Sequence, residues 1–416
     1  MTEKSAKPQL RFAEFDDTWE QRKLGDIMNV TSVKRIHQSD WTDSGIRFLR
    51  ARDIVSASKN EEPDDYLYIS KEKYDEYSLV SGKVTIGDLL VTGVGTIGVP
   101  YLIRNSEPLY FKDGNIIWFQ NGTKIDGDFF LYSFFGKAIQ DFINESAGIG
   151  TVGTYTIESG KKTPISLPEI KEQQQIGAYF RTLDNLITLH QRKYDKLTNV
   201  KKSMLEKMFP KNGSNVPEIR FKGFTEAWEQ RKLIDYLEVS FLKNKTGVYG
   251  KEDVLSVSGD FGIVNQIEFQ GRSFAGASLA NYGVVETGDI VYTKSPLKAN
   301  PYGIIKANKG KAGIVSTLYA AYKPKENTDS TFVQIYFEQD ARMNNYMQPL
   351  VNKGAKNDMK VSDENALKGR VSFPKKPEQI AISSYFESLD NLITLHQREL
   401  EKLKNLKKAC LEKMFV

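Results

Sequence analysis

The sequence has few of the residues that build metal centres and disulfide frameworks. It contains one cysteine, Cys410, and three histidines, His37, His190 and His396. A single cysteine excludes a disulfide framework and a Cys-rich zinc module, and three scattered histidines leave little room for a His-based metal site. We therefore expect no metal site in this chain.

Long apolar runs are also missing. No run approaches the roughly 20 residues that are needed to cross a bilayer. The first residues are polar and do not form the apolar core of a signal peptide. We therefore expect a cytoplasmic protein with no membrane segment. The 416 residues are more than one compact core usually holds, so we expect two or more domains.

Catalytic motifs are not found. Residues 93–98 and 148–153 both fit the glycine pattern of a dinucleotide-binding loop. Strand-like residues follow each of them, whereas a phosphate would need the amino terminus of a helix. We interpret both as glycine hairpins or loops. Because the sequence has no nucleophile–base pair and no phosphate loop, we expect no catalytic residue and no cofactor in this chain.

The chain contains a duplicated unit. Residues 172–209 match residues 378–415, with 25 of 38 positions identical. Residues 19–24, Trp-Glu-Gln-Arg-Lys-Leu, return as residues 228–233. Chance does not produce matches of this length, so the two halves descend from one unit. Between the repeated ends the two halves are mostly dissimilar.

The repeated segment predicts one long helix in each half. Its apolar positions recur at spacings of three and four residues, which is typical of a seam that packs against another helix. A lone helix of this length is marginal in water, so we expect the two copies to form an antiparallel pair. The predicted interface consists of Leu183, Ile187, His190, Tyr194, Leu197, Leu389, Ile393, His396, Leu400 and Leu403.

The segments between the repeats predict β-rich domains. Short apolar or alternating runs between turn residues indicate strands at residues 88–92, 101–104, 115–120, 289–293, 313–318 and 331–336. A helix is expected at residues 129–144. The predicted fold class is therefore α+β. Two mixed β-rich domains are joined by two long helices that form an antiparallel coiled coil, with a pseudo-two-fold internal repeat.

The distribution of charge favours a nucleic-acid partner. The formal net charge is +5, and the excess of positive charge lies in residues 211–416. Residues 290–325 contain seven lysines and no acidic residue, which favours contact with phosphates over a merely solvated surface. The candidates in this half are Lys294, Lys298, Lys309 and Lys311, with Lys353 and Lys356 in a Gly/Asn-containing loop.

The first half offers a second group of basic residues. Its candidates are Lys34, Arg35, Arg47, Arg50 and Arg52. We predict that the last three lie on an extended segment and share one face, and arginine is the usual bidentate reader of guanine. Pairing of each arginine with a nearby carboxylate is equally compatible with the sequence.

As a set, these features resemble the specificity subunit of type I restriction–modification enzymes. The resemblance covers the whole chain and rests on four repeated elements. These are the Trp-Glu-Gln-Arg-Lys-Leu opening, a Gly-Asp strand at residues 87–92 and 288–293, a Ser-Leu/Phe-Pro entry at residues 166–168 and 372–374, and the Leu-Asp-Asn-Leu-Ile helix. In this family Gly-Thr-Ile-Gly follows the first strand, as at residues 95–98. The second half departs from this pattern with Ser295. The resemblance adds Thr92, Thr96 and Ser295 to the DNA-binding candidates.

The resemblance also implies an organisation into domains. The first target-recognition domain would span residues 1–168 and the second residues 217–374. The family's conserved long helices would span residues 169–210 and 375–416, with a linker at residues 211–216. Each recognition domain would read one half of a bipartite, asymmetric site in double-stranded DNA.

The partners follow from the same resemblance. The helices would dock two modification subunits, which bind S-adenosylmethionine and methylate adenine N6. Restriction subunits would join through them and use ATP and Mg²⁺. Two alternatives stay open. One is a non-catalytic coiled-coil adaptor or RNA-binding protein, and the other, disfavoured by the missing cofactor motifs, is a fused methyltransferase or nuclease. If the chain binds DNA, replacing Lys294 and Lys298 by Ala should weaken binding to the second half-site and reduce its salt dependence.

Overall fold

A computed structural model describes residues 7–147, 153–211, 213–294, 299–353 and 359–416. The chain divides into two compact units. Unit 1 consists of Met1–Gln191 and Gln397–Val416, and unit 2 consists of Arg192–His396. Each unit therefore contains part of both long helices. The domain boundaries given above, which separate the helices from the recognition domains, stay a prediction.

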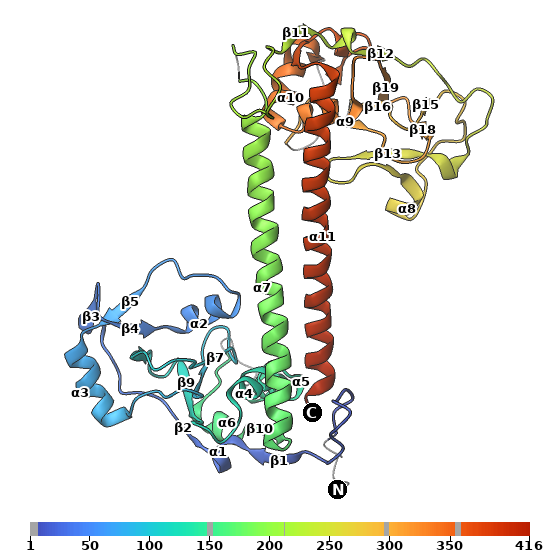
Figure 1. The fold of residues 1–416 in the computed structure, drawn as a ribbon. Helices are drawn as coiled ribbons and strands as arrows, with labels where there is room; N and C mark the ends of the chain where they lie inside the picture. The colour runs from blue at the N-terminus through green and yellow to red at the C-terminus, as the bar shows by residue number, and fades with distance from the viewer. Residues whose placement is uncertain (1–6, 148–152, 212, 295–298, 354–358) are drawn as a thin grey trace. The chain divides into compact units, whose positions relative to one another are not determined.

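The two repeated segments form long helices, α7 (Ile170–Lys207) and α11 (Lys376–Met414) (Figure 1). In unit 1, Lys407 of α11 donates a hydrogen bond to Asp184 of α7 over 2.6 Å. In unit 2, Lys201 of α7 pairs with Asp390 of α11 at 2.7 Å. In both units a late residue of one helix meets an early residue of the other, so the helices pair antiparallel, as the sequence predicts.

Each unit is built on the same four-stranded antiparallel sheet. In unit 1 the strand order is β2 (Asn29–Thr31), β9 (Ile116–Gln120), β6 (Leu89–Thr92) and β7 (Pro100–Leu102). In unit 2 it is β12 (Leu237–Val239), β19 (Tyr319–Pro324), β16 (Ile290–Thr293) and β17 (Ile304–Ala307). A two-stranded sheet accompanies each, formed by β1 (Glu20–Lys23) with β10 (Pro164–Leu167) and by β11 (Glu229–Lys232) with β22 (Arg370–Phe373).

We call the four-stranded sheet and the two-stranded sheet of each unit its frame. A pair of helices covers each frame. Unit 1 has α4 (Gly127–Ser133) and α5 (Lys137–Ser146), where the sequence predicts one helix at residues 129–144. Unit 2 has α9 (Ser330–Phe337) and α10 (Asp340–Met347). The strand predicted at residues 331–336 is wrong, because these residues form α9. Aromatic and β-branched residues favour a strand here, but the Asp329 carboxylate caps a helix by accepting from the Phe332 amide over 2.8 Å.

The other strand predictions hold with shifted ends. Strands β6, β9 and β16 are found where they are expected, and β7 and β18 (Gly313–Val315) are shorter. Residues 93–98 connect β6 to the antiparallel β7, so the interpretation of this glycine motif as a hairpin is confirmed. Residues 148–152 of the second glycine motif lie outside the described residues.

Close approach of α7 to α4 depends on a glycine. A Cβ atom added at Gly177 would lie 2.7 Å from Oδ1 of Asp126, the residue that caps α4. At the matching place in unit 2, α11 has Ser383, whose hydroxyl donates to the Asp329 carboxylate over 2.5 Å. In both units the long helix therefore contacts the capping aspartate of the neighbouring helix, through a glycine in unit 1 and a serine in unit 2.

The units differ in the lobes attached to their frames. Lobe 1 comprises residues 33–81 with β8, and it contains the sheet β3-β5-β4-β8 and helices α2 and α3. The bounds are β3 (Trp41–Thr42), β4 (Ile46–Leu49), α2 (Ala51–Ser58), β5 (Leu67–Ile69), α3 (Lys71–Ser81) and β8 (Leu109–Phe111). It has its own core of Ile36, Phe48, Ile69, Tyr74, Tyr77 and Tyr110.

Lobe 2 comprises residues 240–285 with β18. Its bounds are β13 (Leu255–Ser258), β14 (Gly262–Asn265), α8 (Gln266–Gln270) and β15 (Gly283–Val285). Strand β13 pairs with β14 and β15 pairs with β18, an arrangement that lobe 1 does not have. Different lobes on equal frames explain why only the ends of the two halves repeat in sequence. The remaining short helices and strands are α1 (Leu24–Ile27), α6 (Ile157–Lys162), β20 (Asn352–Lys353) and β21 (Met359–Lys360).

Each long helix ends in the core of the unit that the other repeat builds. Phe209, just after α7, packs in unit 2 against Trp228, Phe332 and Phe386. Phe415, just after α11, packs in unit 1 against Phe129 and Phe180. The two repeats thus complete one another's cores. Among the described residues, no helix is long and apolar enough to span a membrane.

Candidate nucleic-acid interface

The arginines of lobe 1 lie where β4 ends and α2 begins. Arg47 belongs to β4, Arg50 is the residue before α2, and Arg52 lies in the first turn of α2. The prediction of one extended segment is therefore wrong beyond Leu49. The cause is Asp53, whose carboxylate accepts a hydrogen bond from the Arg50 amide over 2.8 Å and so starts the helix.

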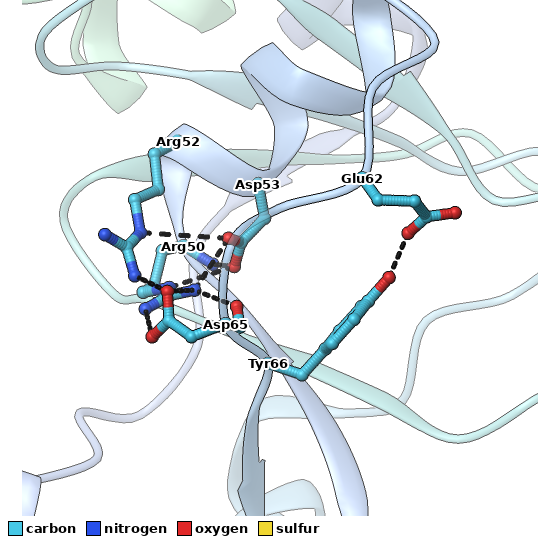
Figure 2. Close-up of polar contacts among 6 residues, drawn as sticks. All are labelled: Arg50, Arg52, Asp53, Glu62, Asp65 and Tyr66. Atoms are coloured by element: carbon cyan, nitrogen blue, oxygen red, sulfur yellow. Dashed lines mark hydrogen bonds and ion pairs between the residues drawn. The ribbon is translucent and has the colours of Figure 1, made fainter. Parts of the chain in front are cut away.

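Arg50 and Arg52 are held by two carboxylates (Figure 2). Nη2 of Arg50 donates to Asp53 over 2.9 Å, and its Nη1 donates to Asp65 over 2.8 Å. Arg52 also donates to Asp65. Asp65 lies just before β5, so the cluster ties the loop ahead of β5 to the start of α2.

The same contacts set the charge of this cluster. Burial opposes the charged form of Arg50, but the hydrogen bonds from its guanidinium to Asp53 and Asp65 outweigh burial and raise its pKa. The hydrogen bond from Arg50 holds the pKa of Asp65 below its ordinary value. Both partners are therefore charged and neutralise one another, so Arg50 and Arg52 organise the loop and α2 before any ligand binds.

Arg47 is held in a different way. Its guanidinium carbon lies 3.7 Å from the centroid of the Tyr66 ring. Its Nη1 is buried, and within the described part of the chain it has no hydrogen-bond partner. The Tyr66 hydroxyl donates to Glu62, which raises the pKa of Tyr66 and fixes the ring (Figure 2). Unlike Arg50 and Arg52, Arg47 has no carboxylate partner among the described residues.

Two further basic residues flank the cluster. Nζ of Lys34 lies 4.1 Å from the centroid of the Tyr77 ring. Arg35 donates to Asp113 over 2.8 Å, which raises the pKa of Arg35, and its side chain is 68 % exposed. Both are exposed, so both can meet a polyanion, although Arg35 already has a counter-charge.

The two threonines of the β6–β7 hairpin have different positions. Thr96 is exposed. Thr92 is fully buried, and its hydroxyl donates to the Thr96 carbonyl over 2.5 Å and accepts from the Val99 amide over 3.0 Å. The expectation that Thr92 faces DNA is therefore wrong, because its hydroxyl closes the hairpin.

The acid-free stretch of unit 2 does not form a continuous basic surface. Carboxylates from other parts of the fold reach its lysines: Lys294 pairs with Asp363 at 2.5 Å and Lys309 with Glu387 at 2.9 Å. Lys306 is only 9 % exposed. Lysines that have no acidic neighbour in the sequence are thus paired with carboxylates from elsewhere in the fold.

The remaining candidates of unit 2 are described only in part. Lys311 is exposed, with no acidic partner among the described residues. Lys353 belongs to the short strand β20. Ser295, Lys298 and Lys356 lie outside the described residues. The variants Lys294→Ala and Lys298→Ala still test binding to the second half-site. Loss of Lys294 also leaves Asp363 without its ion-pair partner.

The structure places the predicted interface residues on the sheltered side of the helices. Leu183, Leu389 and Leu400 are buried. Ile187, His190, Tyr194, Leu197, Ile393, His396 and Leu403 are half-buried. None of the ten is exposed, which fits the antiparallel pairing.

The sequence analysis missed a second apolar feature of the helices. Within the repeated block, four leucines are exposed: Leu186 and Leu189 of α7 at 38 % and 45 %, and Leu392 and Leu395 of α11 at 45 % and 52 %. They occupy matching positions in the repeated block at residues 183–192 and 389–398. The sequence could have indicated this surface, because two of the three leucines in each copy of the block fall outside the predicted seam.

Among the described residues, no group of three or more His, Cys, Asp or Glu side chains is placed to hold a metal ion.

Comparison with known proteins finds a family that matches part of the chain. The family described as the type I restriction modification DNA specificity domain matches residues 16–199. Over these residues the chain is similar to type I restriction–modification specificity subunits. The match covers the frame and lobe of unit 1 together with most of α7.

Relatives with curated names agree with this specificity-subunit family. A Haemophilus influenzae protein named as a type I restriction enzyme specificity subunit is 34 % identical over 170 residues, 40 % of this chain and 41 % of that protein. The aligned region thus spans less than half of that relative's length. A Methanocaldococcus jannaschii protein named as the MjaX specificity subunit is 23 % identical over 419 residues, 95 % of this chain and 92 % of that protein.

A solved structure shares the fold of this chain. The S subunit of a type I restriction–modification system from M. genitalium superimposes with a TM-score of 0.59 and 13 % sequence identity, covering 99 % of both chains. At this identity the likeness shows the fold alone. The α+β architecture with long helices α7 and α11 is therefore shared with this solved structure.

Proposed function

We propose that this protein is the DNA-reading subunit of a type I restriction–modification complex, and that each unit reads one half of a bipartite site. The observation that carries the proposal is the combination of equal frames with unlike lobes. Strand order, helix pair and buried arginine–carboxylate bridges recur, as in Arg11–Glu172 and Arg220–Glu378. Readers that must recognise different bases need different surfaces on the same support.

Lobe 1 supplies the best-defined DNA contact surface. It combines Arg47, exposed Lys34 and exposed Arg35 with the arginine–carboxylate cluster that fixes the start of α2. Positive side chains that are held in place suit groove recognition, whereas phosphate contacts supply affinity that depends on salt. In unit 2 the corresponding candidates are Lys309, Lys311 and the residues around Ser295.

The chemistry would belong to partner subunits. Modification subunits would bind S-adenosylmethionine and methylate adenine N6, and restriction subunits would use ATP and Mg²⁺ to move along DNA and cut it. This chain would contribute site selection only, without catalysis of its own. Acting on cellular and incoming DNA, the complex would work in the cytoplasm.

The exposed leucines support docking of two modification subunits. Leu186 and Leu189 in unit 1, and Leu392 and Leu395 in unit 2, present the same side chains at the same helix positions. Identical apolar surfaces that occur twice suit two copies of one partner, because each copy can use the same contacts. Single exposed leucines need no explanation, but a pair repeated in both helices does.

Docking can be tested by counting subunits. Leu189→Ser and Leu395→Ser should each reduce the number of bound modification subunits from two to one, and the double variant should bind none. Native mass spectrometry of the purified complex measures the count. Leu406→Ser is the matched control, because Leu406 is 42 % exposed on α11 outside the repeated pair. Two bound subunits on the double variant would place docking elsewhere.

The function itself is tested by reconstitution. The purified chain is mixed with duplex DNA, with and without a modification subunit and S-adenosylmethionine. We expect no methylation by the chain alone, and adenine methylation at one bipartite sequence by the mixture. Methylation by the chain alone would show a fused methyltransferase. A partner that methylates with no sequence preference in its presence would show a mere adaptor, and a preference for RNA would show an RNA-binding protein.

A further inference from the structure

We propose that Arg47 reads a guanine in the half-site bound by unit 1, and that Tyr66 and Glu62 are positioning residues for it. This inference rests on the proposed function, and it assigns one base-reading residue to the surface of lobe 1. It starts from a difference among the three neighbouring arginines of that lobe.

The Arg47 side chain is held by stacking instead of by charge. Its guanidinium carbon lies 3.7 Å from the centroid of Tyr66, a distance at which the cation is attracted to the face of the ring. A guanidinium stacked on a ring keeps its plane fixed while its N–H groups remain available along its edge. This is the orientation control that recognition of a base edge requires.

The ring itself is braced. The Tyr66 hydroxyl donates to the Glu62 carboxylate, and Figure 2 shows the ring pointing from the β5 side of the loop towards Glu62. On the other side of the Tyr66 backbone, Asp65 is fixed by Arg50 and Arg52. Two consecutive residues are therefore anchored in opposite directions, which holds the surface on which Arg47 stacks.

Arg47 has an unmet need for a hydrogen-bond acceptor. Its Nη1 is buried and has no hydrogen-bond partner among the described residues. Buried donors in native proteins are nearly always paired, so this donor is satisfied only when the side chain turns outward to meet an acceptor or an acceptor enters beside Tyr66. Arg50 and Arg52 have no such deficit, because Asp53 and Asp65 already accept from them.

Guanine fits this need better than a phosphate does. Its O6 and N7 atoms are two acceptors in one plane, and they match two parallel N–H groups of a fixed guanidinium. A phosphate is also bound by a mobile lysine acting as a point charge, so phosphate contact does not require a braced guanidinium. A stacked and braced arginine is costly to build for that purpose.

The test is a selection experiment on the full complex. The full-length chain, reconstituted with its modification subunit, is offered a randomised duplex library, and the methylated molecules are sequenced. The chains compared are the wild type, Arg47→Gln, Arg47→Lys, Tyr66→Leu and Tyr66→Phe. Arg22→Gln is the matched control, because Arg22 is a partly exposed arginine of unit 1 outside lobe 1. Circular dichroism melting of each chain reports its folding.

We expect Arg47→Gln to lose the preference for guanine at one position of one half-site, by about 10-fold or more, while every other position stays unchanged. Arg47→Lys should lose it as well, because a lysine lacks the planar fork. Tyr66→Phe should keep much of the preference, whereas Tyr66→Leu should lose it. If Arg47→Gln melts at a lower temperature than the wild type, Tyr66→Leu tests the same stacking contact with Arg47 intact.

Three outcomes would overturn the proposal. The first is an unchanged sequence preference in folded Arg47→Gln. The second is a uniform loss across all sequences with a smaller salt slope, which would assign Arg47 to a phosphate. The third is an altered position that is not a guanine on either strand. If the wild-type complex selects no sequence at all, the proposed function fails, and this result is distinct from the other three.

Discussion

Asp53 is a buried carboxylate at the start of α2, only 3 % exposed. It accepts hydrogen bonds from both the amide and the guanidinium of Arg50. A charge in this position is tolerated only because its partner is present, since removing one member of a buried pair leaves the other uncompensated. The stability of lobe 1 at the start of α2 therefore depends on Arg50.

Arg50→Ala should lower the stability of lobe 1 by about 3 kcal/mol, because it leaves Asp53 buried with only part of its hydrogen bonding. Adding Asp53→Asn should recover part of this loss, since the uncompensated charge is gone. Hydrogen exchange of residues 46–58, followed by mass spectrometry, measures the effect locally. Equal protection in the wild type and Arg50→Ala would show that the cluster contributes little to stability.

Asp65 gives lobe 1 a pH dependence of known sign. The hydrogen bond from Arg50 lowers its pKa from the ordinary value of 3.8. A carboxylate whose pKa is lowered in the folded state stabilises that state above its unfolded pKa, and this contribution is lost as the pH falls through the folded pKa. Relative to Asp65→Asn, the wild type should be more stable near neutral pH. The difference should shrink as the pH falls below 3.8 and vanish below the lowered pKa of the folded state. Urea unfolding at several pH values checks this, and a difference that persists in acid would contradict it.

At the scale of elements, the ion pairs that hold the long helices differ in strength between the two units. In unit 2, Glu338 at the end of α9 accepts from Lys201 at 3.0 Å and lies 3.9 Å from Lys306. Burial favours the neutral form of Glu338, but the two lysines outweigh it and lower its pKa. Burial lowers the pKa of Lys306. In unit 1, Lys407 pairs with Asp184 and, among the described residues, with no second carboxylate, in a more open setting of 24 % and 38 % exposure.

Glu338→Gln should therefore cost unit 2 about 3 kcal/mol, because two lysines lose their shared carboxylate in a nearly closed site. Lys407→Ala should cost unit 1 about 1 kcal/mol or less, as is usual for ion pairs near the surface. Hydrogen exchange resolved by unit compares the two variants directly. The order of the two effects is the decisive point, and a larger loss from Lys407→Ala would contradict it.

The helix seam can be tested with a charge. Ile187→Asp and Ile393→Asp should disrupt the helix pair by about 2 kcal/mol, because each puts an unpaired carboxylate into a half-buried apolar position. Asn185→Asp and Thr394→Asp are the controls, since both residues are exposed on the same helices. Thermal melting followed by circular dichroism gives the comparison. Seam and control variants that melt alike would place these isoleucines outside the seam.

The elements also show how far the sequence could lead. The long helices were predictable because a strict repeat and a continuous three-and-four spacing leave no competing structure. The helix at residues 330–337 was not, because its cap at Asp329 and its burial against the sheet override strand-forming residues. For the same reason Arg50 and Arg52 could be named as candidates but not seen to be neutralised, since Asp65 comes from another part of the chain.

At the scale of the whole molecule, duplication followed by divergence of the lobes explains the distribution of features. The frames must keep their mutual dependence, because Phe209 and Phe415 each complete the core of the other repeat's unit. The lobes carry no such constraint and differ in sheet order and helix content. A change within one lobe should therefore alter what one unit binds and leave the other unit's preference intact.

A map of N6-methyladenine in genomic DNA tests this claim most directly, in cells that carry the chain and in otherwise identical cells from which it is deleted. The account predicts one chain-dependent motif with two different specified halves and a gap of fixed length without base preference. Substitutions in lobe 1 should change only one half of that motif. A continuous or palindromic motif, or a lobe 1 substitution that changes both halves, would contradict it.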